Sequence, residues 1–177
     1  MTEQRTRHDT ISILLHGSLA LVTAAVGGSS FFLDGSAGWL KTFHNSAGTI
    51  ALILVVIWLV WRALQNELPQ LATIGVNERR VMELTNGALN VLIVVVPILG
   101  ILDVLGHKDT INLGAFRLSY PLILEEPILR WVSFAHNVLG KLLLVLAAIH
   151  SASAIWHHFV VKDGYLRRML PSSSASE

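Results

Sequence analysis

Four long apolar segments, separated by polar stretches, dominate the hydrophobicity pattern of the chain. They cover approximately residues 11–33, 39–61, 84–105 and 128–161. Each is long enough to cross the hydrocarbon core of a bilayer, which takes about 20 helical residues. Lipid offers the backbone no hydrogen-bond partners, so such segments cross as helices. The pattern predicts an all-α integral membrane protein, a four-helix transmembrane bundle in up-down-up-down order.

The polar connections indicate how these helices are joined. Residues 34–38 form a short link, so we expect the first two helices to be antiparallel neighbours. A middle loop over 62–80 and a longer connection over 107–127 follow, the latter expected along the outer surface. We expect one domain over 1–170 and a disordered tail over 171–177.

Composition supports a membrane protein and excludes several cofactors. The chain has 177 residues, of which 53% are hydrophobic and 14% charged, whereas a soluble domain carries about a quarter charged residues. Cysteine is absent, which excludes disulfides, iron–sulfur clusters and covalently attached c-type haem. We expect lipid contacts and no nucleic-acid partner.

Basic residues predict the orientation in the membrane. The polar N-terminus and the length of the first apolar segment argue against a cleavable signal peptide, whose apolar region spans about 7–15 residues. Eight basic residues fall on the side of the termini, namely Arg5, Arg7, Arg62, Arg79, Arg80, Lys162, Arg167 and Arg168, and four on the other, namely Lys41, Lys108, Arg117 and Arg130. Both termini are therefore expected to face the cytoplasm.

A ten-residue motif, W-x4-H-N-x2-G, occurs at residues 39–48 and again at 131–140, at the entrances of the second and fourth helices. His44 and His136 each follow a tryptophan by five residues. If both tryptophans lie in the interfacial aromatic belt, both imidazoles lie about 7–8 Å below it, at the same level.

A second pair of histidines is level near the opposite surface. His150 lies 19 residues after Trp131, and His16 lies 18 residues before Asp34, which places them about 28 and 27 Å down. Because fourteen helical residues return to within about 40° of the starting direction, His136 and His150 face the same way from one helix.

Two level pairs of intramembrane histidines indicate haem more than another metal. Zinc and copper sites usually have three or four protein ligands, whereas each level here offers two. In bis-histidine haem the porphyrin supplies the four equatorial nitrogens. Gly48 and Gly140 lie one turn after His44 and His136, and Gly17 follows His16, where each leaves room for a flat macrocycle; close helix packing is the alternative explanation.

Further polar residues have open roles. Asn45 and Asn137 point about 100° away from their histidines, toward a haem propionate or a neighbouring helix. His157 continues the histidine stripe one heptad beyond His150, where it is a quinone contact, a proton donor or a solvated interfacial residue. Lys141, about 15 Å down the fourth helix, either snorkels outward or pairs with a propionate.

The remaining features have ordinary expectations. His158 points off the stripe, and His8 and His107 are expected to be surface residues. Pro97 and Gly100 are expected to kink the third helix.

The sequence resembles the bacterial cytochrome b561 family of inner-membrane di-haem b-type cytochromes. The likeness covers nearly the whole chain, through ISILLH, FHNSAG, PILG, AHNVLG, AAIH and the ending WHHFVVKDGYLRRMLP. It implies His16 with His150 as ligands of the inner haem b and His44 with His136 as ligands of the outer one. The chain departs from the family at Gly17, where tryptophan is frequent, and lacks a histidine near Glu83 and Asn86 that relatives of the superoxide oxidases carry.

Three functions follow from these observations. The first is electron transfer across the inner membrane between a periplasmic donor, such as superoxide, and ubiquinone. Lys41, Lys108, Arg117 and Arg130 would then steer an anion to the outer haem, unless they are ordinary solvated residues. The second is a haem-bearing anchor subunit for a dehydrogenase or hydrogenase partner, and the third is a non-redox proton-relay transporter.

Overall fold

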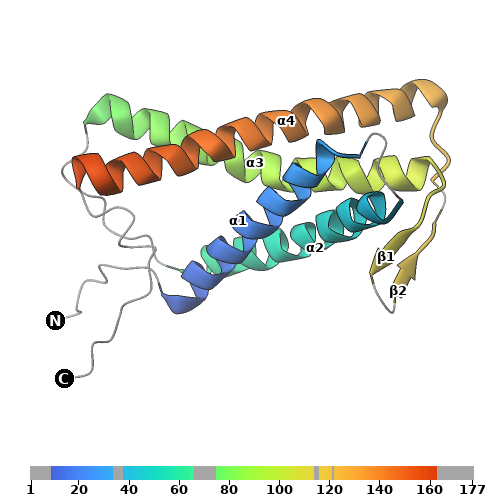
Figure 1. Ribbon diagram of the computed structural model, residues 1–177, viewed down its shortest axis with the longest axis horizontal. Coiled ribbons are helices and arrows are strands. Elements are labelled where there is room, and N and C mark those ends of the chain that lie inside the picture. Colours follow the sequence, from blue (N-terminus) through green and yellow to red (C-terminus); the bar gives the residue numbers. More distant parts are fainter. Residues whose placement is uncertain (1–8, 34–37, 66–74, 114–115, 121, 163–177) are drawn as a thin grey trace.

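Four long helices make up the body of the protein. The computed structural model describes residues 9–33, 38–65, 75–113, 116–120 and 122–162. Within them the helices are α1 (Thr10–Ser30), α2 (Gly38–Ala63), α3 (Val76–Gly106) and α4 (Glu126–Trp156) (Figure 1). All four are long and apolar enough to span a membrane, so the predicted four-helix transmembrane bundle is confirmed.

The first helix is shorter than the apolar segment that predicted it. α1 begins at an N-cap, where Asp9 Oδ1 accepts a hydrogen bond from Ser12 N at 3.2 Å. It ends at Ser30, three residues before the predicted end. Near this end, the hydroxyls of Ser29 and Ser30 donate to the carbonyls of Val26 and Gly27, both at 2.6 Å. Serine side chains that bond the backbone in this way compete with helical hydrogen bonds.

The third helix begins earlier than predicted, at Val76 rather than near residue 84. Its first turns are charged, so the hydropathy pattern predicts a loop there. Glu78 lies in the first turn, where a negative charge is favourable to the helix dipole, and Arg79 pairs with Glu83 one turn later at 3.1 Å. The helix continues without interruption through Pro97. At 31 residues it is about 46 Å long, longer than a hydrocarbon core of about 30 Å.

A π-helical turn, η1 (His157–Val161), extends α4 and is followed by the C-cap residue Lys162, whose φ is 57°. The two together cover the segment predicted as one helix. π-helical turns are rare in proteins, and those that occur are often at functional sites. Here the turn contains His157, which is buried.

A small β-hairpin lies in the long connection between α3 and α4. Its strands, β1 (Ile111–Leu113) and β2 (Phe116–Leu118), are antiparallel, with Ile111 opposite Leu118. β1 packs against α2, Ile111 is 1% exposed, and the Ser46 hydroxyl donates to the Asn112 carbonyl. The end of the bundle that carries the hairpin is called the hairpin end, and the end where α1 begins and η1 stops is called the η1 end (Figure 1).

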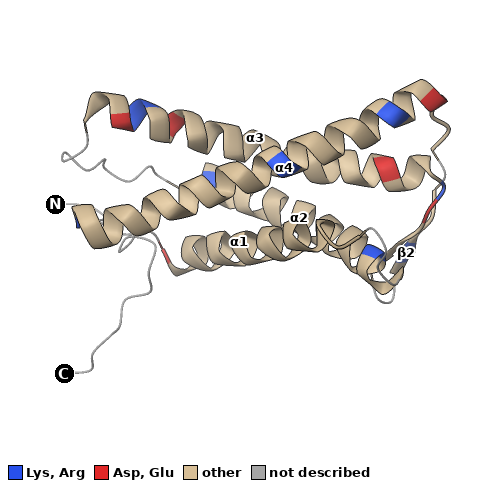
Figure 2. Cartoon of the chain, turned by 45° about the horizontal axis from the view of Figure 1, so that its top comes forward, with Lys and Arg blue, Asp and Glu red and all other residues tan. Residues whose placement is uncertain are grey.

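The helices pack as two pairs. α3 packs along α4 and α1 along α2, α2 joins the pairs through α3, and α1 meets α4 at fewer positions. A hydrophobic core lies between α3 and α4, formed by Leu92, Val96 and Leu143 with Leu89, Leu139 and Leu146 around it. Large apolar side chains are exposed along all four helices, including Leu21 at 74% and Leu84 at 74%, as expected of surfaces that face lipid. Charged residues gather toward the two ends of the bundle. One basic position, drawn in blue, lies in the middle of α4 (Figure 2).

Candidate functional site

His44 of α2 and His136 of α4 face each other near the hairpin end. Their ring centres are 6.1 Å apart and their planes are inclined by 84°. The two histidines that the repeated motif predicted at one level are thus also close in space.

The hydrogen bonds of these two rings define which nitrogens remain free. His44 Nδ1 lies 3.0 Å from the Val26 carbonyl oxygen, and His136 Nδ1 lies 3.0 Å from the Val96 carbonyl oxygen. A carbonyl oxygen only accepts, so each Nδ1 carries the proton and donates. In a neutral imidazole this leaves the lone pair of Nε2 available, which is the usual arrangement of a metal-binding histidine.

Ser29 supports the ring of His44. Its side chain is buried, with 8% of the residue exposed, and its Oγ lies 3.0 Å from His44 Nδ1. The same hydroxyl donates to the Val26 carbonyl at 2.6 Å, so the Nδ1 proton of His44 lies between two oxygen acceptors. The orientation of the ring is therefore fixed from α1.

The spacing of the two rings suits one metal ion between them. Two imidazole nitrogens that each lie about 2.0 Å from one metal ion are about 4 Å apart. When the distance from each nitrogen to the centre of its ring is added, the ring centres are about 6 Å apart. Among the described residues, no group of three or more histidines, aspartates or glutamates is placed to hold a metal ion. Two histidine nitrogens would complete the coordination of an iron whose other four ligands come from a porphyrin.

The second predicted pair has the same spacing. The ring centres of His16 in α1 and His150 in α4 are 6.4 Å apart, with an angle of 66° between the planes. His150 follows His136 by fourteen residues on α4, about 21 Å along the helix axis. One face of α4 thus provides a histidine to each pair, with α2 and α1 providing the others.

The glycines next to the histidines are not required by helix packing. A Cβ atom at Gly48 would lie 3.9 Å from Val26 Cγ1, and one at Gly140 would lie 3.8 Å from Val96 Cγ1, which are ordinary contacts. A Cβ at Gly17 would meet nothing within 4 Å. Close helix approach therefore does not explain these three positions, and the space beside them is available to a bound group.

Gly100 is a site residue, although the sequence pattern predicts only a kink of the third helix there. A Cβ atom here would lie 2.8 Å from Cε1 and 3.2 Å from Nδ1 of His136. Gly100 also follows Val96 by one helical turn, so the missing side chain leaves the Val96 carbonyl open to His136. The signal was present in the sequence as PILG, but its role depends on a neighbouring helix.

Sequence reasoning also missed a carboxylate at the η1 end. His157 Nε2 lies 3.1 Å from Oε1 of Glu78, which belongs to the first turn of α3. The side chain of His157 is 11% exposed and that of Glu78 is 48% exposed. The pair therefore connects a buried imidazole to the surface. His158 instead stacks edge-on against Phe159, with ring centres 4.7 Å apart.

Lys141 lies on the outward side of α4. It follows His136 by five residues and precedes His150 by nine, which places it about 140° and 180° around the helix from them. Its side is exposed, as is that of Asn137 one turn earlier. This direction is incompatible with contact to a group held between the histidines of either pair, so the geometry places Lys141 on the outside of the bundle and argues against a pair with a propionate.

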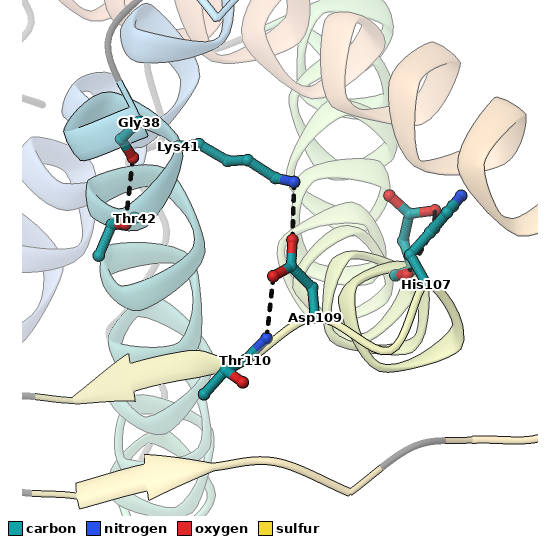
Figure 3. A network of polar contacts seen from close by, with 7 residues as sticks. Gly38, Lys41, Thr42, His107, Asp109 and Thr110 are labelled. Atoms are coloured by element: carbon teal, nitrogen blue, oxygen red, sulfur yellow. Dashed lines mark hydrogen bonds and ion pairs between the residues drawn. The ribbon is translucent and has the colours of Figure 1, made fainter.

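The charged residues at the hairpin end are partly paired. Lys41 Nζ lies 2.7 Å from Asp109 Oδ2 (Figure 3). This hydrogen bond, with a smaller contribution from the Thr110 amide at 3.1 Å, holds the pKa of the Asp109 carboxyl below its usual value. The predicted surface residue His107 lies 3.4 Å from the Asp103 carboxylate. The charge of Lys41 is thus balanced locally, whereas Lys108, Arg117 and Arg130 are exposed. His8 lies outside the described residues.

Comparison with known proteins identifies the family of this chain. The family model for prokaryotic cytochrome b561 matches residues 7–172. The chain is also 27% identical over 169 residues to "Cytochrome b561 homolog 2" of Escherichia coli (strain K12), covering 95% of this chain and 89% of that protein. The family binds b-type haem. The chain therefore belongs to the prokaryotic cytochrome b561 family and is a membrane b-type cytochrome of electron transfer.

Proposed function

We propose that the chain binds two haem b groups, one between His44 and His136 and one between His16 and His150. The observation that carries this proposal is the pair of ring separations, 6.1 and 6.4 Å, together with the free Nε2 atoms of His44 and His136. Gly17, Gly48 and Gly140 would leave room for the macrocycles. When bound, haem iron supplies one-electron oxidation and reduction.

The proposed function is electron transfer across a bacterial inner membrane, from a donor at the hairpin end to ubiquinone at the η1 end. The two histidine pairs lie about 21 Å apart along α4, which supports a path through the membrane. The excess of basic residues on the side of the termini supports a cytoplasmic η1 end and a periplasmic hairpin end.

Superoxide is the donor that the hairpin end supports best. Lys108, Arg117 and Arg130 are exposed there and would attract a small anion, while Lys41 is balanced by Asp109 and contributes less. Two superoxide anions would each lose one electron and leave as dioxygen. One ubiquinone would gain these two electrons and two protons and become ubiquinol.

Protons for the quinone would enter through Glu78 and His157. The exposed Glu78 carboxylate contacts the buried His157 ring at 3.1 Å, which is suited to passing a proton from water to a site inside the membrane surface. This supports His157 as a quinone contact or proton donor, rather than a solvated interfacial residue.

A second candidate function is a haem-bearing anchor subunit that passes electrons for a dehydrogenase or hydrogenase. The exposed Lys141 in the apolar middle of α4 favours a membrane partner. Membership of a cytochrome family leaves the proton-relay transporter without support.

The haem proposal is tested by the haem content of the purified full-length protein and its variants. We expect two haems per chain with b-type absorption bands after reduction. His44→Ala, His136→Ala and the double variant should each retain one haem, because both residues hold the same group. The double variant His44→Ala/His16→Ala should retain none. Loss of both haems, or of neither, in His44→Ala would contradict the pairing.

The donor is tested separately. In proteoliposomes that contain ubiquinone, an enzymatic source of superoxide should drive quinol formation by the wild-type protein. No quinol should form when superoxide dismutase is added, or when the haem-free variant His44→Ala/His16→Ala replaces the wild-type protein. Intact haems without superoxide-driven quinol formation would favour the anchor-subunit function.

A further inference from the structure

The outward face of α4 carries a cation near the middle of the membrane. Trp131 and Trp156 are exposed at 69% and 59%, as expected of tryptophans at the two interfacial levels of a transmembrane helix. They are 25 residues apart, about 37 Å, which spans a hydrocarbon core of about 30 Å with a margin at each side. Lys141 lies about 15 Å from the level of Trp131 and about 22 Å from that of Trp156. It is therefore close to the midplane.

Lipid is a poor partner at this depth. A lysine near a helix end can extend its stem and place the ammonium among the headgroups. The side chain of Lys141 leans toward the N-terminus of α4, as side chains do in helices, but it is too short to span the distance to Trp131. Ionisable residues inside a membrane usually pair with another residue.

Lys141 belongs to a regular stripe of exposed residues, which we call the outer stripe. Its members are exposed and are separated alternately by three and by four residues. They are Trp131, Phe134, Val138, Lys141, Val145, Ala148 and Ala152. This spacing is typical of a helix face that packs along a second helix. Ala148 and Ala152 are four residues apart, an arrangement of small residues that lets two membrane helices approach closely.

The hairpin end of this stripe is hollowed. A shallow hollow of about 390 Å³ is lined by Pro127, Arg130, Trp131 and Phe134. The stripe thus offers a hollow at one end, a cation in the middle and small residues beyond it.

A second copy of the chain would not supply the opposite charge. Two copies inserted in the same direction and packed through this stripe would bring their lysines to the same level, where they repel. Asp103 contacts Ser133 of α4, which is eight residues, or about 12 Å, from Lys141. Glu78 contacts His157, which is sixteen residues, or about 24 Å, away. Neither carboxylate is level with Lys141.

We propose that the outer stripe binds a transmembrane helix of another membrane protein, and that Lys141 forms an ion pair with an aspartate or glutamate of that helix. Charge complementarity at the midplane selects the partner, and the hollow and the two alanines accommodate its side chains. The inference does not depend on the proposed electron donor or acceptor.

The test is site-specific photo-crosslinking of the full-length protein in its native membranes. A photoreactive residue at Val138 or Val145 should form an adduct with a membrane protein, and sequencing of the adduct should place it beside an aspartate or glutamate in a transmembrane segment. The same probe at Leu21 of α1, which is 74% exposed, should give no such adduct. Lys141→Met should abolish the adduct, and Lys141→Arg should keep it.

Charge exchange decides whether the contact is an ion pair. Lys141→Glu should lose the adduct, and replacing the partner's acidic residue by lysine in the same cells should restore it. An adduct only with a second copy of this chain, adducts only with lipid, or an adduct unchanged by Lys141→Met would overturn the proposal.

A measurement that leaves Lys141 unchanged keeps the test decisive if Lys141 variants fail to accumulate. The chain contains no cysteine, so one introduced at Leu64 would carry a fluorophore. Energy transfer in liposomes would then report binding of a synthetic leucine–alanine transmembrane helix with a single central aspartate. Binding should be about three- to tenfold tighter than that of the same helix with asparagine or leucine at this position. Equal binding of the three helices would overturn the proposal.

Discussion

Gly100 of α3 touches the imidazole of His136 on α4 so closely that a Cβ atom at position 100 would lie 2.8 Å from Cε1 of the ring. The backbone of α3 therefore forms one wall of the His136 site. It also supplies the acceptor of the ring, since the Val96 carbonyl lies 3.0 Å from His136 Nδ1. A single helical turn, Val96 to Gly100, thus fixes both the position and the protonated nitrogen of this histidine.

Gly100→Ala should consequently weaken the haem site at the hairpin end and spare the other. The added methyl group pushes the His136 ring away from Val96, and loss of such a supporting contact typically lowers affinity by about 10–100-fold. The haem content of the purified variant should fall from two per chain toward one. Gly87→Ala is the matched control on the same helix, because a Cβ there meets nothing within 4 Å. Two haems with unchanged spectra in Gly100→Ala would refute this role.

Ser46→Ala should loosen the β-hairpin. The Ser46 hydroxyl donates to the Asn112 carbonyl in β1, and the removal of such a bond from a partly buried acceptor costs about 0.5–1.5 kcal/mol. Amides of residues 111–113 and 116–118 should then exchange hydrogen about two- to tenfold faster. Ser30→Ala is a suitable control, because its hydroxyl donates within α1, to the Gly27 carbonyl. Unchanged exchange in the hairpin would show that β1 is held by the burial of Ile111 instead.

The sequence was sufficient to predict the helices and the levels of the histidines. A helix advances about 1.5 Å per residue, so the distances of His44 and His136 from their tryptophans determine depth without a structure. The structure brings together the same partners that depth selected. The boundaries were less predictable, because apolar length measures only the part of a helix in lipid. For this reason the pattern predicts a loop where the charged first turns of α3 lie.

The supporting residues could not be found from the pattern. Every residue has a carbonyl, and only the packing of α1 against α2 selects the one at Val26 for His44. Glu78 is an ordinary glutamate in the sequence until α3 places it against His157. The contact between Lys41 and Asp109 joins residues 68 positions apart, and it changes the expected role of Lys41 from anion steering to local charge balance.

Lys41→Gln should reduce stability only slightly, and only where Asp109 is ionised. Lys41 lowers the pKa of Asp109 in the folded protein, so the stabilisation is present above the unfolded value of about 3.9 and is lost as the pH falls through the lower, folded value. Both side chains are well exposed, at 64% and 44%, so screening limits the effect to about 0–1 kcal/mol. Thermal unfolding of wild type and variant should differ at pH 7 in low salt and converge in acid or in high salt. A difference that grows toward low pH would contradict this assignment.

Glu78→Gln should slow quinone reduction without changing the haems. Glutamine keeps the size and a hydrogen-bond partner for His157 Nε2 but cannot release or accept a proton at neutral pH, so the step that delivers protons becomes slower. We expect a loss of about tenfold or more in the rate of quinol formation, with a changed dependence of that rate on pH. The matched control is Glu83→Gln, whose carboxylate pairs with Arg79 on the exposed side of the same helix at 3.1 Å. If the two variants reduce quinone equally fast while both retain normal haem spectra, protons reach the quinone by another route, and His157 serves α4 as a structural residue.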